Sequence, residues 1–307
     1  MPERYSFTRY LSAKKSIDSR ALNHHVWQSL AQALPTSTPE NPLQVLEVGS
    51  GIGTMLERIL EQRLLTHTNY TAIDIQVENI VEARQQLQHW ADSHNSRVTE
   101  TAQGNLLLER TKQQVLVEFE AIDIFDFTTR EQGRRKWDML VAHAFLDLMD
   151  IPATLPRLFS LLRDGGLFYF TINFDGATIL EPVIDPQLDE LIPTLYHQTM
   201  DRRIVNGKVS GDSRAGRHLF IYLKNAGAHI LDAGPSDWVV FAGTDGYAED
   251  EASFLHFIIN TIDLALKGHP QLDASRFTAW VAKRHAQVER GELVCIIHQL
   301  DFVGRYP

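Results

Sequence analysis

The chain of 307 residues has a single cysteine, Cys295, so it cannot form an intrachain disulfide. Such low cysteine usage is typical of proteins in a reducing compartment. No apolar run approaches the ~18 residues that a membrane-spanning helix needs, and residues 1–20 hold no apolar core of signal-peptide length. From these absences we expect a soluble, cytoplasmic protein with no membrane partner.

The sequence also lacks an excess of positive charge. Its 29 Lys and Arg residues face 39 Asp and Glu residues, which gives a formal net charge of −10. Nucleic-acid phosphates attract a basic surface, so this balance argues against a nucleic-acid partner. Residues 134–136 form a dense basic cluster, which we interpret as a solvated turn before a strand.

Two common catalytic patterns are missing as well. There is no His-Glu-x-x-His motif and no pair of cysteines, so we expect no metal site. The Gly-x-Ser-x-Gly elbow of hydrolases would need glycine where Val48 and Ile52 stand. These absences remove the simplest zinc-enzyme and serine-hydrolase interpretations.

What the sequence does contain, from residue 44 onward, is an alternation of short apolar segments with amphipathic helical ones. Strands are expected at residues 44–48, 69–75, 115–122, 138–142 and 167–172. Helices are expected between most of them, for example at 77–94. This order predicts an α/β fold with a doubly wound, mostly parallel sheet.

Residues 174–212 interrupt the alternation and are too long for an ordinary connection. A helix at 214–226, a strand at 228–240, a helical pair at 249–289 and a last strand at 293–302 are expected beyond them. We therefore divide the chain into an N-terminal arm with a lid helix (1–40), a core (41–173), an active-site insert (174–212) and a C-terminal part of the sheet (213–307). The arm and the helical insertions would form a lid.

The candidate ligand site starts at the end of the first expected strand, where Gly49, Gly51 and Gly53 alternate with other residues. Glycine has no Cβ, so a ligand can approach the backbone closely. The dinucleotide pattern Gly-x-Gly-x-x-Gly would require glycine at Thr54. The spacing therefore disfavours a nicotinamide-dependent oxidoreductase.

Residues 45–53 closely resemble the glycine loop of class I (Rossmann-like) methyltransferases, which use S-adenosyl-L-methionine (SAM) and release S-adenosyl-L-homocysteine. The resemblance covers about residues 43–173 and implies a seven-stranded sheet; the whole chain is similar to bacterial members with long C-terminal extensions. It also implies that Glu47 lies near the amino-acid end of SAM. Gly49, Ser50, Gly51 and Gly53 would form the cradle. A carboxylate at position 47 suits an ammonium and a sulfonium and would repel a pyrophosphate.

Acidic residues follow the next two strands at matching places. Asp74 lies 21 residues beyond Gly53 (74 − 53), where strand-end acids accept hydrogen bonds from ribose hydroxyls, and Ile75 lies next to it. After the third strand, the resemblance implies that Asp123 faces the adenine amino group and that the N–H of Ile124 meets a ring nitrogen. Asp126 is the alternative acid.

The fourth strand ends at His143, which the resemblance places beside the methyl group of the cofactor. Methyl transfer from a sulfonium is an in-line displacement in which positioning carries much of the catalysis. A general base is needed only if the acceptor is protonated. His143 and His197 are the candidate bases, because histidine titrates near neutrality; Asp147 and His218 are weaker candidates.

The arm carries Arg9, which would pair with the carboxylate of SAM. The insert and the helical pair would close the pocket, which favours a small-molecule methyl acceptor. The sequence thus predicts a SAM-dependent methyltransferase. Two alternatives stay open: a non-catalytic SAM-binding module and, less favoured, a nicotinamide-dependent oxidoreductase. Whether oxygen, nitrogen, carbon or sulfur receives the methyl group also stays open.

Overall fold

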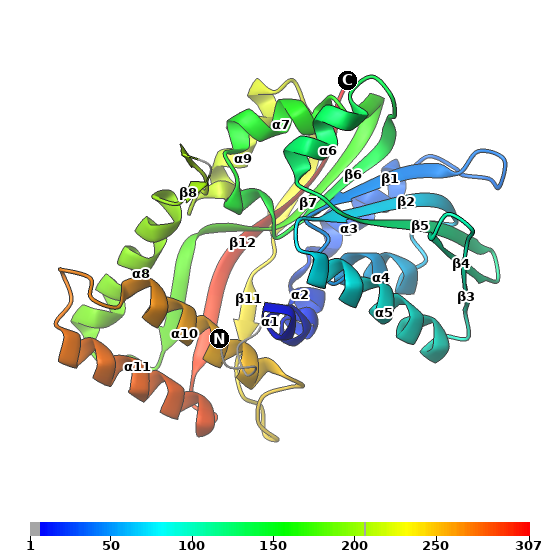
Figure 1. Cartoon of the computed structure of the whole chain (residues 1–307). Coiled ribbons are helices and arrows are strands. Elements are labelled where there is room, and N and C mark those ends of the chain that lie inside the picture. Colours follow the sequence, from blue (N-terminus) through cyan, green and yellow to red (C-terminus); the bar gives the residue numbers. More distant parts are fainter. Residues whose placement is uncertain (1–6, 206) are drawn as a thin grey trace.

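The computed structural model describes residues 7–205 and 207–307 and has a ten-stranded mixed sheet at its centre (Figure 1). The strands lie in the order β10-β12-β7-β6-β1-β2-β5-β4-β3, and β11 pairs with β12. The predicted α/β architecture with a mostly parallel, doubly wound sheet is confirmed. The expected count of seven strands is too low for the described residues, because short strands extend both edges.

The parallel part of the sheet consists of the five strands that carry the core. They are β1 (Leu43–Val48), β2 (His67–Asp74), β5 (Gln113–Ala121), β6 (Trp137–His143) and β7 (Leu162–Glu181). β12 (Val294–Arg305) runs antiparallel to β7, and both β10 (His229–Pro235) and β11 (Trp238–Val240) run antiparallel to β12. The expected strand at 228–240 is therefore two strands.

A short hairpin on the edge of β5 was missed by the sequence reading. It consists of β3 (Arg97–Glu100) and β4 (Leu106–Arg110), which pair antiparallel with each other and with β5. β3 has no buried residue and is largely polar, so it lacks the apolar alternation that marks a half-buried strand.

Helices cover both faces of the sheet (Figure 1). On one face lie α3 (His24–Ala33), α4 (Thr54–Glu61) and α5 (Val77–Ser93); on the other lie α6 (Ile124–Glu131), α7 (Ile151–Phe159) and α9 (Ala215–Asn225). Each face has its own buried apolar cluster: Val45 and Leu56 belong to the first, and Leu46 and Phe159 to the second. Alternate residues of β1 thus pack against opposite helical layers, as the two-residue period of a strand requires.

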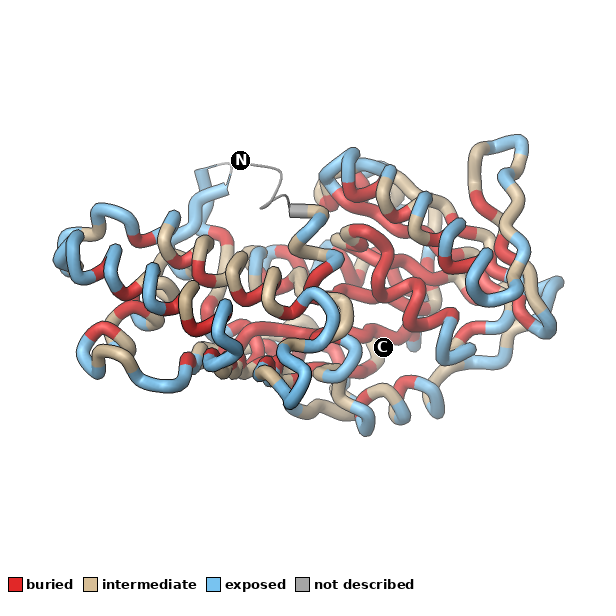
Figure 2. Tube along the Cα trace, turned by 90° about the horizontal axis from the view of Figure 1, so that it is seen from below, coloured by how far each residue is buried: buried red, intermediate tan, exposed pale blue. Residues whose placement is uncertain are grey.

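The insert and the helical pair form a second lobe on the far ends of β7 and β12. Its helices are α8 (Pro186–Asp201), α10 (Glu251–Leu266) and α11 (Ala274–Glu289), and a third buried cluster joins them to these strands. Figure 2 shows buried and exposed residues alternating along these helices, with the buried ones facing inward.

The insert has regular elements, although the sequence analysis predicts no particular elements there. β7 continues through residue 173 to Glu181, α8 follows, and the hairpin of β8 (Ile204–Val205) and β9 (Lys208–Val209) precedes α9. Pro186 opens α8, where its missing N–H costs nothing. Pro193 is tolerated inside the same helix. The four-part division of the chain stays a prediction.

The N-terminal arm lies between the core and the second lobe (Figure 1). Ahead of α3, its described part forms α1 (Phe7–Ala13) and α2 (Lys15–Ala21); residues 1–6 lie outside the described residues. The ring of Tyr10 stacks on Phe257 of α10 at 4.2 Å between centroids. Arg58 of α4 donates from Nε to Ser19 Oγ at 3.1 Å. The arm therefore contacts both lobes.

Within the described ranges, no helix combines the length and apolar character needed to cross a bilayer.

A glycine on β12 offers a test of how tightly the sheet is packed. A Cβ on Gly304 would collide with the ring of Phe168 on β7 and with the carbonyl oxygen of His229 on β10. We expect Gly304→Ala to lower the free energy of unfolding by about 1–3 kcal/mol, the usual cost of overpacking, measured by urea denaturation.

The matched control is Gly243→Ala, where the nearest atom to the added Cβ, the carbonyl oxygen of Gly246, is 3.9 Å away. Equal stability of the two variants would show that the contact between β7, β12 and β10 is looser than described.

Candidate active site

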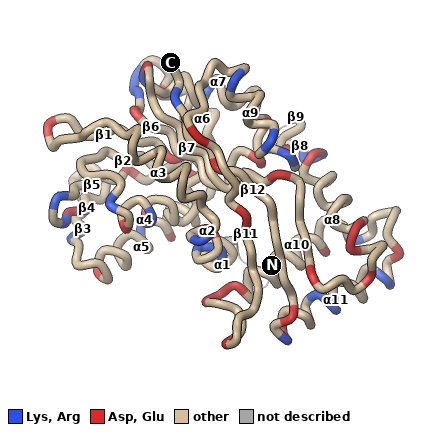
Figure 3. Tube along the Cα trace, turned by 180° about the vertical axis from the view of Figure 1, so that it is seen from behind, with Lys and Arg blue, Asp and Glu red and all other residues tan. Residues whose placement is uncertain are grey.

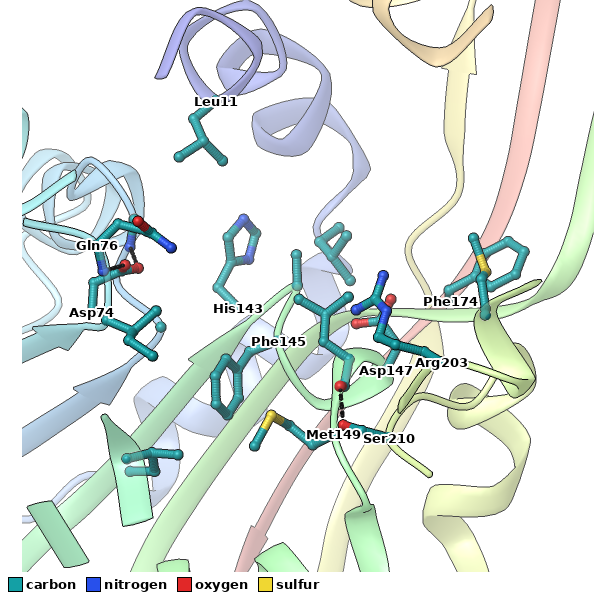
Figure 4. A pocket seen from close by; sticks show the side chains of 18 of the residues that line it. Leu11, Asp74, Gln76, His143, Phe145, Asp147, Met149, Phe174, Arg203 and Ser210 are labelled. Carbon is teal, nitrogen blue, oxygen red and sulfur yellow. Dashed lines mark hydrogen bonds between the residues drawn. The ribbon is translucent and has the colours of Figure 1, made fainter. Parts of the chain in front are cut away.

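A cavity of about 820 Å³ opens where β1, β2, β5 and β6 end. Residues at the ends of these four strands and just beyond them line it: 49–52, 74–76, 122–125, 143–145 and 147–150. Ligands of open α/β sheets bind outside the carboxyl ends of the parallel strands. Figure 4 shows Asp74 and Gln76 on one side of this cavity, His143 and Phe145 in the middle, and Phe174 on the other side.

The glycine loop supplies the wall after β1. Gly49 and Gly51 adopt φ values of +64° and +54°, which favour glycine. A Cβ on Gly49 would also overlap the ring of Phe145. Between them, the hydroxyl of Ser50 is buried and has no hydrogen-bond partner among the described residues. The loop therefore presents an unpaired donor and bare backbone to the cavity.

Gly53 has a different place from the one expected. It lies outside the cavity lining and is the N-cap of α4, with φ of +83°. A Cβ there would lie 3.4 Å from the Cβ of Ala83 on α5. Gly53 therefore lets α4 start close to α5.

Asp74 ties the end of β2 to the glycine loop. Its Oδ2 accepts a hydrogen bond from the N–H of Gly51 at 2.9 Å, and its Oδ1 accepts from Gln76 N at 2.8 Å and Asn79 Nδ2 at 3.1 Å. A carboxylate has about four acceptor sites, so one site on Oδ2 is available to a ligand. Ile75, beside it, also lines the cavity.

Asp123 and Ile124 line the cavity after β5, and Asp126 does not. Asp123 is the N-cap of α6 and accepts at Oδ1 from the N–H groups of Phe125, at 2.7 Å, and Asp126, at 3.4 Å. The geometry thus favours Asp123 over Asp126, whose side chain is exposed on the helix.

The structure does not place Glu47 at the cavity, contrary to our expectation. Glu47 is buried and accepts a hydrogen bond at Oε2 from the hydroxyl of Tyr70 at 2.7 Å. Burial raises the pKa of Glu47 to about 8, against the lowering effects of Tyr70 and Arg58. The reason is strand geometry: Glu47 shares its face of β1 with Val45, which points to the α3, α4 and α5 layer.

Arg9 is also displaced from its expected role. Its guanidinium pairs with Asp250 at 3.2 Å, and both side chains are about half exposed and outside the cavity lining. The arm instead contributes Tyr10, Leu11 and Lys14 to the cavity. A Cβ on Gly51 would lie 3.3 Å from Leu11 Cδ1, so α1 closes directly over the glycine loop.

A buried polar network joins the arm to the end of β6, and the sequence reading missed its centre, Asp18. Asp18 Oδ2 lies 2.7 Å from Lys14 Nζ and 3.0 Å from His143 Nε2, and Oδ1 accepts from Trp238 Nε1 at 2.8 Å. Burial alone would raise the pKa of Asp18, but Lys14 and His143 hold it well below its usual range. The only signal in the sequence was the i,i+4 spacing of Lys14 and Asp18.

His143 is fully engaged within the protein. Beyond Asp18, its Nδ1 lies 2.8 Å from Thr171 Oγ1. Burial lowers the pKa of His143 to about 4, which outweighs the raising effect of Asp18. A neutral ring that donates from Nε2 to Asp18 and accepts at Nδ1 from Thr171 satisfies both contacts. His143 lines the cavity, but these contacts count against a role as a base.

The second candidate base, His197 of α8, lies outside the cavity lining. Its Nε2 is 3.0 Å from Thr178 Oγ1, and Thr178 does line the cavity. Burial lowers the pKa of His197. His218 lies outside the lining too and pairs with Asp212 at 2.7 Å.

The far half of the cavity is a chamber built by the second lobe, and the sequence did not identify most of it. It is lined mainly by apolar and aromatic side chains from β7, α8, β11, α10 and β12: Phe174, Tyr196, Met200, Trp238, Phe257, Ile258 and Ile297. The described residues contain no group of three or more His, Cys, Asp or Glu side chains arranged to hold a metal ion.

Part of the sequence matches a known family of domains. Residues 46–168 match a family model described as a methyltransferase domain. No curated protein matches the sequence.

Two solved structures illustrate the likeness of fold. A putative methyltransferase from Bacillus halodurans C-125 has 10% sequence identity and a TM-score of 0.50, over 93% of this chain and 100% of that one. A SAM-dependent methyltransferase from Thiobacillus denitrificans, solved with S-adenosyl-L-homocysteine, has 15% identity and a TM-score of 0.44, over 94% and 93%. At these identities the likeness concerns the fold.

The matched residues include the glycine loop, Asp74, Asp123 and His143, and all of these except Gly53 of the loop line one cavity. This chain therefore carries a methyltransferase domain at residues 46–168.

Proposed function

We propose that the protein transfers a methyl group from SAM to a small molecule bound in the same cavity. The observation that carries this proposal is the continuity of the cavity from the strand ends of the core into the apolar chamber of the second lobe. Its volume of about 820 Å³ lies toward the upper end of the ~300–1,000 Å³ typical of small-ligand pockets. Such a space suits two small ligands held end to end.

The residues at the core end fit the cofactor. Gly49 and Gly51 leave room that a Cβ would fill, the Ser50 hydroxyl lacks a partner, and Oδ2 of Asp74 has a free acceptor site. We infer that Asp74, with Ile75 beside it, holds the ribose hydroxyls. Asp123 and the N–H of Ile124 would hold the adenine. When bound, the cofactor supplies a methyl group activated as a sulfonium.

The chamber end supports a small acceptor. The arm, α8, α10 and the β8–β9 hairpin surround it, and its walls are mainly apolar. A folded protein or a polynucleotide would need an open groove, whereas a small molecule needs only enclosure. We infer that the arm and the chamber walls orient the acceptor and exclude water, which is how positioning contributes to catalysis.

The first test is direct. The purified protein is incubated with methyl-labelled SAM and either the small-molecule fraction or the macromolecular fraction of a cell extract. We expect label to appear in a small molecule, because the arm, α8, α10 and the β8–β9 hairpin surround the chamber on several sides.

Label in protein or nucleic acid alone would refute the small-molecule acceptor. Tight binding of S-adenosyl-L-homocysteine without any transfer would favour the alternative of a non-catalytic cofactor-binding module.

The second test concerns the cofactor end. We expect Asp74→Ala to weaken binding of S-adenosyl-L-homocysteine by ~1–3 kcal/mol, the cost of losing hydrogen bonds to a charged group. Isothermal titration calorimetry measures this change. Asp92→Ala, an exposed aspartate on α5, is the matched control and should bind as the wild type does.

Since Asp74 also anchors Gly51 and Asn79, the thermal midpoint of each variant must be recorded. A correctly folded Asp74→Ala protein with undiminished affinity would remove Asp74 from the site.

The third test concerns the two histidines. We expect His197→Ala to change kcat less than tenfold, because His197 lies outside the cavity lining and its Nε2 is hydrogen-bonded to Thr178. We expect His143→Ala mainly to lower the thermal midpoint, because it breaks the contact with Asp18. A general base typically contributes ~10²–10⁴-fold, so a loss of that size in kcat at unchanged cofactor affinity would restore that histidine as the base.

A further inference from the structure

Asp147 lines the cavity and carries a carboxyl oxygen without a hydrogen-bond partner. The residue lies in the short 3₁₀ helix η2 (Leu146–Leu148) that follows β6, and it is partly exposed. Its Oδ1 is shielded from solvent and has no hydrogen-bond partner among the described residues. The backbone carbonyl of Asp147 separately accepts from Asp212 N at 3.0 Å.

Asp147 lies where core and chamber meet. In Figure 4 its carboxyl group appears between His143 and Phe174, next to the guanidinium of Arg203. Arg203 follows α8 and lines the cavity, and no ion pair within 4.0 Å joins it to Asp147. Figure 3 shows both basic and acidic positions near β8 and β9.

Several charged and titratable groups influence the pKa of Asp147. Burial raises this pKa to about 6 and Asp212 adds to the rise, whereas the backbone N–H of Asp147 itself, Arg203 and Lys14 lower it. Burial also raises the pKa of the phenols of Tyr10 on α1 and Tyr196 on α8, and the negative charge of Asp147 adds to both rises.

An unpaired buried carboxyl group costs free energy, because the protein replaces none of its lost hydrogen bonds to water. Such a cost is typical of functional sites. The contrast with His143 is informative, because both ring nitrogens of His143 already have partners inside the protein. Among the residues considered as bases, Asp147 is therefore the one that lines the junction of core and chamber and has an oxygen without a hydrogen-bond partner.

We propose that the carboxylate of Asp147 accepts the hydrogen bond, and then the proton, of a hydroxyl or amine group on the methyl acceptor. This inference rests on the proposed function and narrows the acceptor to small molecules that carry an O–H or N–H nucleophile and an apolar body. A carboxylate or thiolate acceptor would instead bring a second negative charge against Asp147.

The proposed step balances in atoms and charge. The acceptor oxygen or nitrogen forms a bond to the methyl carbon while the carbon–sulfur bond breaks, and the electron pair of that bond stays on sulfur. The acceptor proton moves to the carboxylate of Asp147 and leaves it as a neutral carboxylic acid, which later returns the proton to water. A carboxyl group with a pKa of about 6 is mostly ionised at pH 7 and still has a usable affinity for a proton.

The test compares wild type, Asp147→Asn and the control Asp245→Asn, an exposed aspartate in a loop outside the cavity lining. The methyl acceptor used in this assay is the small molecule that becomes labelled when the wild-type protein is incubated with methyl-labelled SAM. We expect Asp147→Asn to lower kcat ~10²–10⁴-fold, the usual contribution of a general base. Its affinity for S-adenosyl-L-homocysteine should stay within about threefold of the wild-type value, because Asp147 lies outside the cofactor end of the cavity.

A second readout does not depend on activity. Because the folded pKa of Asp147, about 6, lies above the unfolded value of 3.8, the folded state binds more protons between these values. The wild type therefore loses stability as the pH rises through this window, and the Asn variant does not. The thermal midpoint of Asp147→Asn relative to wild type should rise from pH 4 to pH 7, and that of Asp245→Asn should not.

Arg203→Met supplies a third check if Asp147→Asn folds poorly. Removing this positive charge should raise the pKa of Asp147 and move the acid limb of the pH dependence of kcat upward. Transfer by Asp147→Asn at the wild-type rate, or an unchanged acid limb in Arg203→Met, would overturn the role of Asp147 alone. Absence of transfer by the wild type would overturn the proposed function, and this inference with it.

Discussion

The buried carboxylate of Asp18 holds the site together. It is fully buried and receives hydrogen bonds from a residue of the arm, from the end of β6 and from β11 of the second lobe. Leaving one member of a buried charged cluster unpaired typically costs ~3–5 kcal/mol, so the three parts are strongly constrained to stay in register. The cover over the glycine loop and the wall of the chamber therefore depend on one side chain.

The core of the fold was predictable because its signals are local. Gly49 and Gly51 follow an apolar strand, Asp74 and Asp123 end later strands, and the helices between them show a clear apolar face. Strand order follows from such an alternation through the rules of parallel sheets. For the same reason, most expected cofactor-binding residues line a single cavity.

The remaining features depend on contacts between residues far apart in sequence. Glu47 and Val48 are neighbours, yet they point to opposite faces of β1, and residue type alone did not show that Glu47 meets Tyr70. Arg9 pairs with Asp250, which is 241 positions away, and Asp18 accepts a hydrogen bond from Trp238, which is 220 positions away. Asp147 gave no stronger sequence signal than other aspartates, because what distinguishes it is the lack of a partner in three dimensions.

β7 and β12 belong to both lobes, and this continuity limits how the molecule can move. Backbone pairing between them extends from Leu167 and Arg305 in the core to Glu181 and Val294 in the second lobe. Hinged closure of two rigid bodies would have to bend or break this ladder, whereas the β8–β9 hairpin forms a two-stranded sheet of its own. Passage of small molecules into and out of the cavity should therefore depend on this hairpin at the rim, with the lobes themselves acting as a fixed frame.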